Sequence, residues 1–234
     1  MVRKPRILIV EDETAIRTGL VDVFVYHGFD VDFAVEGPTG LAKALTGIFD
    51  LVLLDVMLPG QNGFDICEAI RSRDRDQPII LLTAKSADET IIQGLALGAD
   101  DYVTKPFSVA QLVLRVQAVL RRARITTEQE SLIRLGGDGE IDTRNLFGHI
   151  NGAEVAFTRR EMDVLQYLCE HHERPVPREE LLNKVWGYAR DLDLETRTVD
   201  IHIAKLRRKI EPDPKQPRYL LTVRGGGYRL VTEN

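Results

Sequence analysis

The chain has 234 residues, 44% of them hydrophobic, and a formal net charge of −5, which suits two domains with buried cores. No stretch approaches the roughly 18 consecutive apolar residues of a membrane span, and the first residues carry no signal-peptide core. We therefore expect a cytoplasmic protein with no membrane partner. Cys67 and Cys169 fall in patterns of separate domains, which argues against a disulfide and against a cysteine metal site.

The first half of the chain alternates short apolar runs with amphipathic stretches. The runs at 6–10, 29–35, 50–55, 78–84 and 100–107 are typical of strands, and the unbroken ones indicate strands buried on both faces. Helical spacing covers 16–27, 39–45, 64–73, 87–97 and 108–122, with Gly28 after the first helix and Ser108 as N-cap of the last. Strand and helix pairs in this alternation predict an α/β fold with a doubly wound, five-stranded parallel sheet.

Polar side chains stand where four of these strands end. Glu11 and Asp12 follow the first strand, Asp55 ends the third, Thr83 lies at the end of the fourth and Lys105 at the end of the fifth. Ligands of open α/β sheets bind at this edge, and clustered carboxylates suit Mg²⁺ because they repel one another without a cation. With a hydroxyl and an ammonium group beside them, the set suits a carboxylate that accepts a phosphoryl group. Singly, each acid could be a helix cap or a turn residue.

Four motifs over residues 5–122 closely resemble the receiver domain of two-component response regulators. They are Ile-Val-Glu11-Asp12-Glu, Leu-Leu-Asp55-x-Met-Leu-Pro59-Gly-x-x-Gly63, Leu-Leu-Thr83-Ala84 and Asp-Asp-Tyr102-x-Thr-Lys105-Pro106-Phe107. The resemblance implies a flavodoxin-like receiver domain in which a sensor histidine kinase phosphorylates Asp55. It also implies that Mg²⁺ is the cofactor, held by Glu11, Asp12, Asp55 and the backbone carbonyl of Met57.

The same resemblance assigns the residues around the phosphoryl group. Thr83 and Lys105 would hold its oxygens, and the Lys105–Pro106 peptide bond would be cis. Thr83 and Tyr102 would form a switch pair, in which Thr83 moves toward the phosphoryl group and Tyr102 turns inward. An ordinary half-buried strand aromatic is the alternative for Tyr102.

A dimer surface is also implied by the resemblance, on the face of the fourth helix, fifth strand and fifth helix. Its apolar centre would be Ile92, Leu95 and Val113, and its charged pairs would come from Asp100, Asp101, Arg115 and Arg122. A merely solvated face is the alternative for these charges. Ile91 and Gln111 stand where relatives commonly carry a further charged pair, which leaves dimer affinity and register open.

Residues 123–131 are polar and predict a linker, so that we expect a receiver at 1–122 and a second domain at 132–234. Short alternating runs from Leu132 to Phe157 predict a small antiparallel sheet, with Asn151-Gly152 as its clearest hairpin turn. A capping box at 158–161, a helix over 178–186, a helix over 195–210 and a hairpin over 219–230 complete an α+β unit.

The predicted helix at 195–210 has two contrasting faces. Val199, Ile203, Leu206 and Ile210 form a core face, and the opposite face consists of Arg197, Ile201, Ala204, Lys205 and Arg208. Residues 196–229 carry nine Lys and Arg against three Asp and Glu, a local basic patch of the kind that phosphate contact needs. Lys205 can donate to guanine and Ile201 can meet a thymine methyl, with Thr198, His202 and Arg207 on the flanks where phosphates would run. A basic helix that is simply solvated remains the alternative here.

The second half, from Thr158-x-x-Glu161 through Thr-Val-Asp-x-His-Ile-x-x-Leu-Arg-x-Lys-Ile to Arg224-Gly-x-Gly-Tyr-Arg, is similar to the winged helix-turn-helix effector of the OmpR/PhoB class. The likeness makes 195–210 the recognition helix, sends Arg224 into a minor groove, and puts Trp186, Thr222 and Tyr228 near phosphates. The chain is therefore expected to be a transcriptional response regulator that becomes a homodimer on phosphorylation and binds direct repeats in double-stranded DNA. RNA polymerase is a further expected partner.

Two other functions compete with this interpretation. A phosphatase with an aspartyl-phosphate intermediate would resemble an Asp-x-Asp motif, but Met57 fills the second position here. An effector that binds proteins and never DNA is disfavoured by the basic helix face. The sequence therefore predicts a phosphoryl-accepting regulator and no ordinary enzyme.

Overall fold

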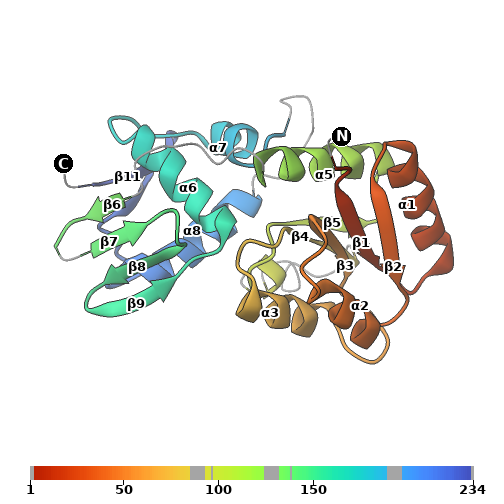
Figure 1. Cartoon of the computed structure of the whole chain (residues 1–234). Coiled ribbons are helices and arrows are strands. Elements are labelled where there is room, and N and C mark those ends of the chain that lie inside the picture. Colours follow the sequence, from red (N-terminus) through yellow and green to blue (C-terminus); the bar gives the residue numbers. More distant parts are fainter. Residues whose placement is uncertain are drawn as a thin grey trace. The chain divides into compact units, whose positions relative to one another are not determined.

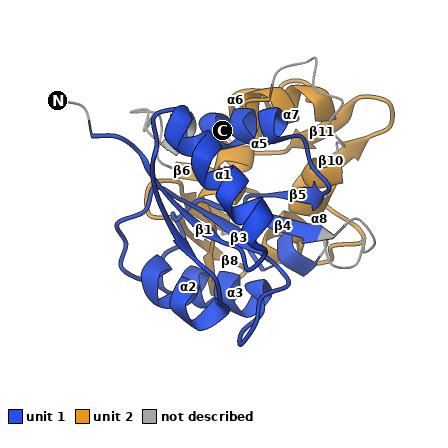
Figure 2. Cartoon of the chain, turned by 90° about the vertical axis from the view of Figure 1, so that its right-hand side faces the viewer, with its two compact units in different colours: residues 1–124 blue, residues 125–234 orange. Residues whose placement is uncertain are grey.

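A computed structural model of the chain describes residues 3–84, 93–95, 97–123, 132–137, 139–188 and 197–232 (Figure 1). The chain divides into two compact units, residues 1–124 and 125–234 (Figure 2). Most of the predicted linker lies outside the described residues, so its bounds stay a prediction. No helix among the described residues is long and apolar enough to cross a membrane.

The first unit is built on a five-stranded sheet in the order β2-β1-β3-β4-β5, with every neighbouring pair parallel. Its strands are β1 (Arg6–Val10), β2 (Asp30–Ala34), β3 (Leu51–Asp55), β4 (Ile79–Ala84) and β5 (Asp101–Lys105). All residues of β3 are buried, because the sheet is covered on both faces. The predicted doubly wound α/β architecture is confirmed.

Helices α1 (Thr14–Tyr26) and α5 (Val109–Ala123) cover one face of this sheet, and α2 (Gly37–Ala44) and α3 (Gly63–Arg73) cover the other (Figure 1). Apolar side chains of α1 and α5 pack on β1, β3 and β4 in one continuous core. Gly28, with φ of 86°, follows α1 as predicted, and Gln111 N–H donates to Ser108 Oγ at 3.4 Å at the start of α5. The helix predicted over 87–97 lies largely outside the described residues, although 93–95 are helical.

The second unit begins with a four-stranded antiparallel sheet in the order β6-β7-β8-β9. These strands are β6 (Leu132–Leu135), β7 (Gly139–Asp142), β8 (Phe147–Ile150) and β9 (Ala153–Ala156). Asn151 and Gly152 take φ of 51° and 77° at the turn between β8 and β9, as two-residue hairpins require. The predicted hairpin is confirmed.

Helices and a second hairpin complete this unit as α6 (Arg159–Glu170), α7 (Arg178–Val185), α8 (Arg197–Ile210), β10 (Leu220–Val223) and β11 (Gly227–Leu230). The predicted capping box opens α6: Thr158 Oγ1 accepts from Glu161 N–H, and Glu161 Oε2 accepts from Thr158 N–H at 2.8 Å. Val199, Ile203, Leu206 and Ile210 are buried, which confirms the predicted core face of α8. The unit is an α+β winged helix.

Candidate functional site

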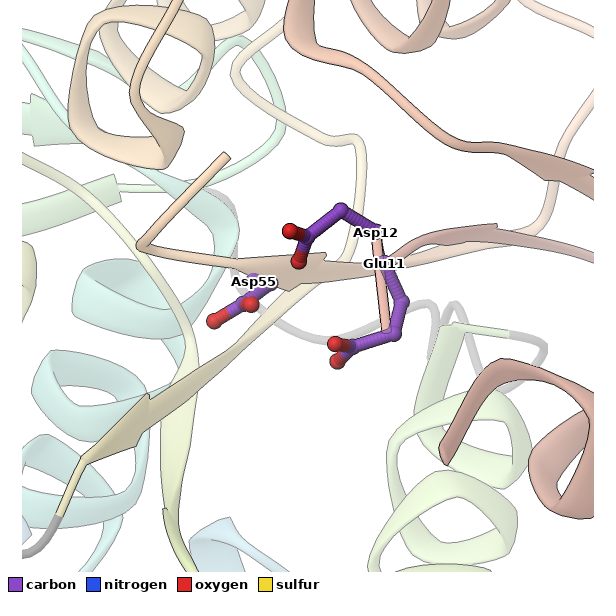
Figure 3. A group of neighbouring side chains, drawn as sticks. All are labelled: Glu11, Asp12 and Asp55. Carbon is purple, nitrogen blue, oxygen red and sulfur yellow. The ribbon is translucent and has the colours of Figure 1, made fainter. Parts of the chain in front are cut away.

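Three carboxylates meet at the carboxyl edge of the parallel sheet (Figure 3). Glu11 follows β1 directly and Asp55 ends β3, which lies next to β1 in the sheet. Carboxylate oxygens of Glu11, Asp12 and Asp55 all lie within 4.8 Å of one another, with Glu11 and Asp55 buried and Asp12 exposed. The sequence predicted this convergence. An oxygen-only set that is open on one side suits a divalent cation that keeps several waters.

Lys105 extends from the end of β5 and joins two of these acids. Its Nζ lies 2.8 Å from Glu11 Oε2 and 2.9 Å from Asp55 Oδ2. Burial alone would lower the pKa of Lys105, but its hydrogen bonds to Glu11 and Asp55 raise it on balance. Burial raises the pKa of Glu11, and the nearby charge of Asp55 adds to that shift. The Lys105–Pro106 peptide bond is cis, as predicted.

Backbone contacts fix the loops that carry the acids. Arg17 of α1 donates through Nη1 to the carbonyls of Glu11, at 2.9 Å, and Asp12, at 2.8 Å. The sequence reasoning missed Arg17, although a cation on the helix that follows an acidic loop is a detectable signal. Gly63 lies so close to β3 that a Cβ there would stand 2.2 Å from the Asp55 carbonyl oxygen. Met57 N–H donates to Asp55 Oδ1 at 3.3 Å, so the backbone of Met57 lies beside the acid.

Thr83 and Tyr102 lie on neighbouring strands next to this edge. The register pairs Asp55 with Leu82, so Thr83 is one residue further along β4. Both Thr83 and Tyr102 are buried. Tyr102 is therefore already an internal side chain in this conformation, and the switch role of the pair stays a prediction.

The predicted dimer surface is mostly internal in this conformation. Leu95 and Val113 are buried, and Val113 belongs to the core of the first unit. Asp100 is buried beside Arg71, whose Nη2 lies 2.8 Å from Asp100 Oδ2. Asp101 pairs with Arg115 of the same chain at 2.6 Å. Leu95 and Val113 are buried and the two acids are paired within one chain in this conformation. Their place in a dimer interface stays a prediction.

Two further members of that surface, Ile92 and the side chain of Arg122, lie outside the described residues, as does Ile91. Gln111 is exposed on α5, and so are Val109 and Leu114. The dimer surface as a whole therefore stays a prediction.

Four residues expected to touch DNA are buried. Trp186 is 0% exposed and packs its ring edge-to-face against His202, with centroids 5.1 Å apart. His202 Nδ1 lies 2.9 Å from the carbonyl of Thr198, which is also buried. Tyr228 is buried and donates its hydroxyl to Asp200 Oδ1 at 2.6 Å. In this conformation these four side chains are held inside the unit, and their contact with DNA stays a prediction.

Three cations of α8, Lys205, Arg207 and Lys209, are paired with other groups of the protein. Lys205 Nζ lies 2.9 Å from Glu161 Oε1, and only 13% of the Lys205 side chain is exposed. Burial would raise the pKa of Glu161, but Lys205 and Lys209 lower it on balance. Arg207 donates through Nε and Nη2 to the carbonyl of Leu220 and through Nη2 to Thr222 Oγ1. In this conformation the ammonium group of Lys205 is paired with Glu161, and its contact with a guanine stays a prediction.

The surface that α8 and the hairpin expose is smaller and still basic. Ala204 and Arg208 of α8 are exposed, as are Thr222 and Arg224 of the hairpin. Arg197 and Ile201 are half-buried. Arg208 is thus the exposed cation of the predicted outward face of α8 in the described part of the chain, and the hairpin adds the exposed Arg224 and Arg229.

Comparison with known proteins agrees with the order of the two units. Residues 7–117 match the response regulator receiver domain, and residues 152–230 match the transcriptional regulatory protein C-terminal domain. The sensory transduction protein RegX3 of Mycobacterium tuberculosis is 39% identical over 225 residues, or 96% of this chain and 98% of that protein. The response regulator ArlR of Staphylococcus aureus is 40% identical over 223 residues, or 95% of this chain and 98% of that protein.

Solved structures give the same result. The response regulator DrrB, a Thermotoga maritima OmpR/PhoB homolog, is 33% identical and covers 97% of this chain and 99% of its own, with a TM-score of 0.52. A mutant of RitR is 29% identical with the same coverage and a TM-score of 0.74. A receiver followed by a winged helix defines a DNA-binding response regulator. Within that class, the chain belongs to the OmpR/PhoB family of two-component response regulators.

Proposed function

We propose that a sensor histidine kinase transfers a phosphoryl group to Asp55 in a Mg²⁺-dependent reaction. The observation that carries the proposal is the ammonium group of Lys105, which bridges Glu11 and Asp55 at 2.8 and 2.9 Å. A phosphoryl group on Asp55 would bring negative oxygens to the place where this cation already lies. Phosphoryl transfer depends mainly on positioning and on neutralising those oxygens, which Lys105 and the buried hydroxyl of Thr83 can do.

In the transfer, an oxygen of Asp55 attacks phosphorus, and a P–O bond forms as the P–N bond to the kinase histidine breaks. The electron pair of that bond returns to the imidazole. Glu11, Asp12, Asp55 and the Met57 carbonyl would hold Mg²⁺, which neutralises charge on the transferred group when bound. The close carboxylates fit it, because their oxygens lie within 4.8 Å of one another. The chain accepts the group as a signal and releases it slowly, so it acts as a regulator and no ordinary enzyme.

Labelling by a small phosphoryl donor such as acetyl phosphate tests this proposal. Asp55→Asn should abolish Mg²⁺-dependent labelling of the full chain. Asp50→Asn is the matched control, since Asp50 precedes the opposite end of β3 and accepts from Arg6 N–H. That variant should label like the wild type. Stoichiometric label on Asp55→Asn would assign the phosphoryl group to another residue.

Phosphorylation would act on DNA binding through dimerisation of the receiver. A homodimer would place two winged helices on half-sites in direct repeat, with α8 in the major groove and Arg224 in a minor groove. Binding two half-sites through one dimer raises affinity because the second effector binds at a high effective concentration. RNA polymerase would then be contacted at the promoter. In vitro selection of DNA should return direct repeats, whereas inverted repeats would contradict a head-to-tail arrangement.

The dimer itself should be weak. Ile91 and Gln111 replace a charged pair that relatives commonly carry. In addition, Asp100 and Asp101 form ion pairs with Arg71 and Arg115 of the same chain, which a dimer would have to exchange for contacts with its partner. Sedimentation of the full chain with beryllofluoride, a phosphoryl mimic, should therefore show mostly monomer at low micromolar concentration. A tight dimer under these conditions would contradict the predicted weakness of the dimer.

A further inference from the structure

Side-chain contacts join the recognition helix α8 to the β10–β11 hairpin, here called the wing, at two points; each of these contacts is called a tie. One lies in the first turn of α8, at Asp200, and the other in its last turn, at Arg207. Both residues reach side chains or carbonyls of β10 and β11, which flank the exposed tip that carries Arg224. Helical periodicity, which predicted the two faces of α8, did not predict either of these contacts.

At the first tie, one carboxylate oxygen holds two donors. Asp200 Oδ1 accepts from Arg178 Nε at 2.6 Å and from the Tyr228 hydroxyl at 2.6 Å. Arg178 Nη2 donates to the same hydroxyl at 2.9 Å, and the guanidinium lies 4.7 Å from the centre of the Tyr228 ring. Each member comes from a different element, α7, α8 or β11, so the triad fixes their mutual orientation. Burial and Asp200 raise the pKa of Tyr228 to about 12, which keeps its hydroxyl a donor.

At the second tie, Arg207 forms hydrogen bonds with β10, the other strand of the hairpin. Its Nε and Nη2 donate to the Leu220 carbonyl at 2.9 and 2.7 Å, and Nη2 donates to Thr222 Oγ1 at 2.7 Å. The planar guanidinium group makes such paired contacts with little freedom to rotate. Together the ties hold both strands of the hairpin to one helix.

The strand pairs next to the hairpin tip have a further anchor in the backbone. Tyr228 and Val176 exchange two N–H···O bonds, at 2.7 and 2.9 Å. Gly227 approaches so closely that a Cβ would lie 2.0 Å from the Val176 carbonyl oxygen. The tip beyond it has no such anchor in the described chain: Gly225 takes φ of 74°, and Arg224 is exposed. The contacts of Asp200 and Arg207 therefore fix the direction in which the anchored strands present the short, exposed tip.

A helix and a wing that must enter adjacent grooves at once bind best when their geometry is already set, because ordering them on binding costs affinity. We propose that Asp200 and Arg207 are positioning residues that hold the wing in register with the recognition helix, so that the DNA contact of Arg224 depends on Asp200. The inference rests on the proposed contact between Arg224 and DNA. Asp200 is 44% exposed in its side chain, so its ion pair adds little stability in solvent and its effect is mainly geometric.

A double-mutant cycle on the full chain tests this coupling. The dissociation constant for a duplex selected by the wild-type chain is measured for wild type, Asp200→Ala, Arg224→Ala and the double variant. Arg224→Ala should weaken binding about 10-fold in the wild-type background, the size of one good groove contact, and about 2-fold or less with Asp200→Ala. Asp200→Asn keeps an acceptor for the Tyr228 hydroxyl and should restore most of the Arg224 effect.

Two further variants separate positioning from loss of folding. Tyr228→Phe removes only the hydroxyl of the triad and should reproduce the loss of coupling. Glu140→Ala breaks the exposed pair between Arg134 and Glu140 on β6 and β7, and should leave the Arg224 effect unchanged. An equal fold-loss for Arg224→Ala in the wild-type and Asp200→Ala backgrounds would overturn the positioning role. No loss for Arg224→Ala in the wild-type background would instead overturn the proposed wing contact on which the inference rests.

Discussion

His202 should make the winged-helix unit sensitive to acid. The imidazole is buried, and its Nδ1 lies 2.9 Å from the Thr198 carbonyl, so the neutral ring donates to it from Nδ1. Burial lowers the pKa of His202 from 6.5 to about 4, the bond to Thr198 opposes this, and the charges of Lys205 and Arg160 lower the pKa further. The folded unit therefore holds this ring neutral at a pH where the unfolded chain protonates it.

The sign and size of the effect follow from that difference. Between pH 6.5 and about 4 the unfolded chain binds a proton that the folded unit does not, so the free energy of unfolding falls as the pH falls. Stability is complete above pH 6.5 and declines by about 1.4 kcal/mol per pH unit below it. Lowering the pH from 7 to 5 should therefore cost about 2 kcal/mol from His202 alone.

The chain carries its own probe for this measurement. Trp186 is the single tryptophan, and its ring centre lies 5.1 Å from that of His202. Its fluorescence during urea unfolding therefore reports on the winged-helix unit and not on the receiver. His202→Asn is the matched variant, since an amide nitrogen can donate to the Thr198 carbonyl without titrating. It leaves a small cavity, which lowers stability at both pH values alike.

Wild type should lose about 2 kcal/mol more than His202→Asn between pH 7 and pH 5. Every other pH-dependent group is common to the two proteins and cancels in the difference. Equal losses in the two proteins would refute the reasoning, because a buried neutral His202 cannot be silent over this range.

Two substitutions in the receiver should have large and distinct effects. Gly63→Ala would press a methyl group onto the Asp55 carbonyl, whose oxygen stands 2.2 Å from the Cβ position. It should slow acetyl phosphate labelling and lower the free energy of unfolding by about 1–3 kcal/mol. Gly19→Ala, where a Cβ would meet nothing within 4 Å, is the control and should do neither. Arg71→Met would leave Asp100 charged and buried, and should cost about 3–5 kcal/mol in urea unfolding followed by far-ultraviolet circular dichroism. Adding Asp100→Asn to Arg71→Met should recover part of that loss, and the absence of any recovery would argue against an uncompensated charge.

The sequence was sufficient for the fold and for the acidic site because both follow from periodic patterns. Apolar runs identified the parallel strands, and parallel strands end at one edge, so Glu11, Asp55, Thr83 and Lys105 had to approach one another. The short distances from Lys105 to two of these acids agree with that argument. What the pattern did not contain was Arg17, whose role depends on where its guanidinium finds backbone carbonyls.

The sequence says less about the surfaces, because a pattern gives a face but not the partner of each side chain. Asp100 was expected at a dimer surface, yet it pairs with Arg71, which lies 29 residues earlier in the sequence. Trp186 and His202 were expected near phosphates, yet each ring is covered by the other and by the core. The polar ring nitrogen of Trp or His suggests a surface position, but the ring itself is large enough to be buried in the core.

Glu161 has a second role that its capping-box motif did not predict: it also pairs with two lysines of α8. The capping box identified it as the residue that accepts from Thr158 N–H, and that bond is present at 2.8 Å. The same buried carboxylate also receives Lys209 at 2.6 Å and Lys205 at 2.9 Å, which anchors α8 to the first turn of α6. Because a buried carboxylate without these cations would be strongly unfavourable, neither lysine is free to neutralise phosphates. The salt dependence of DNA binding should therefore be carried by exposed cations such as Arg208 and Arg224, and a count of all basic residues on α8 overestimates it.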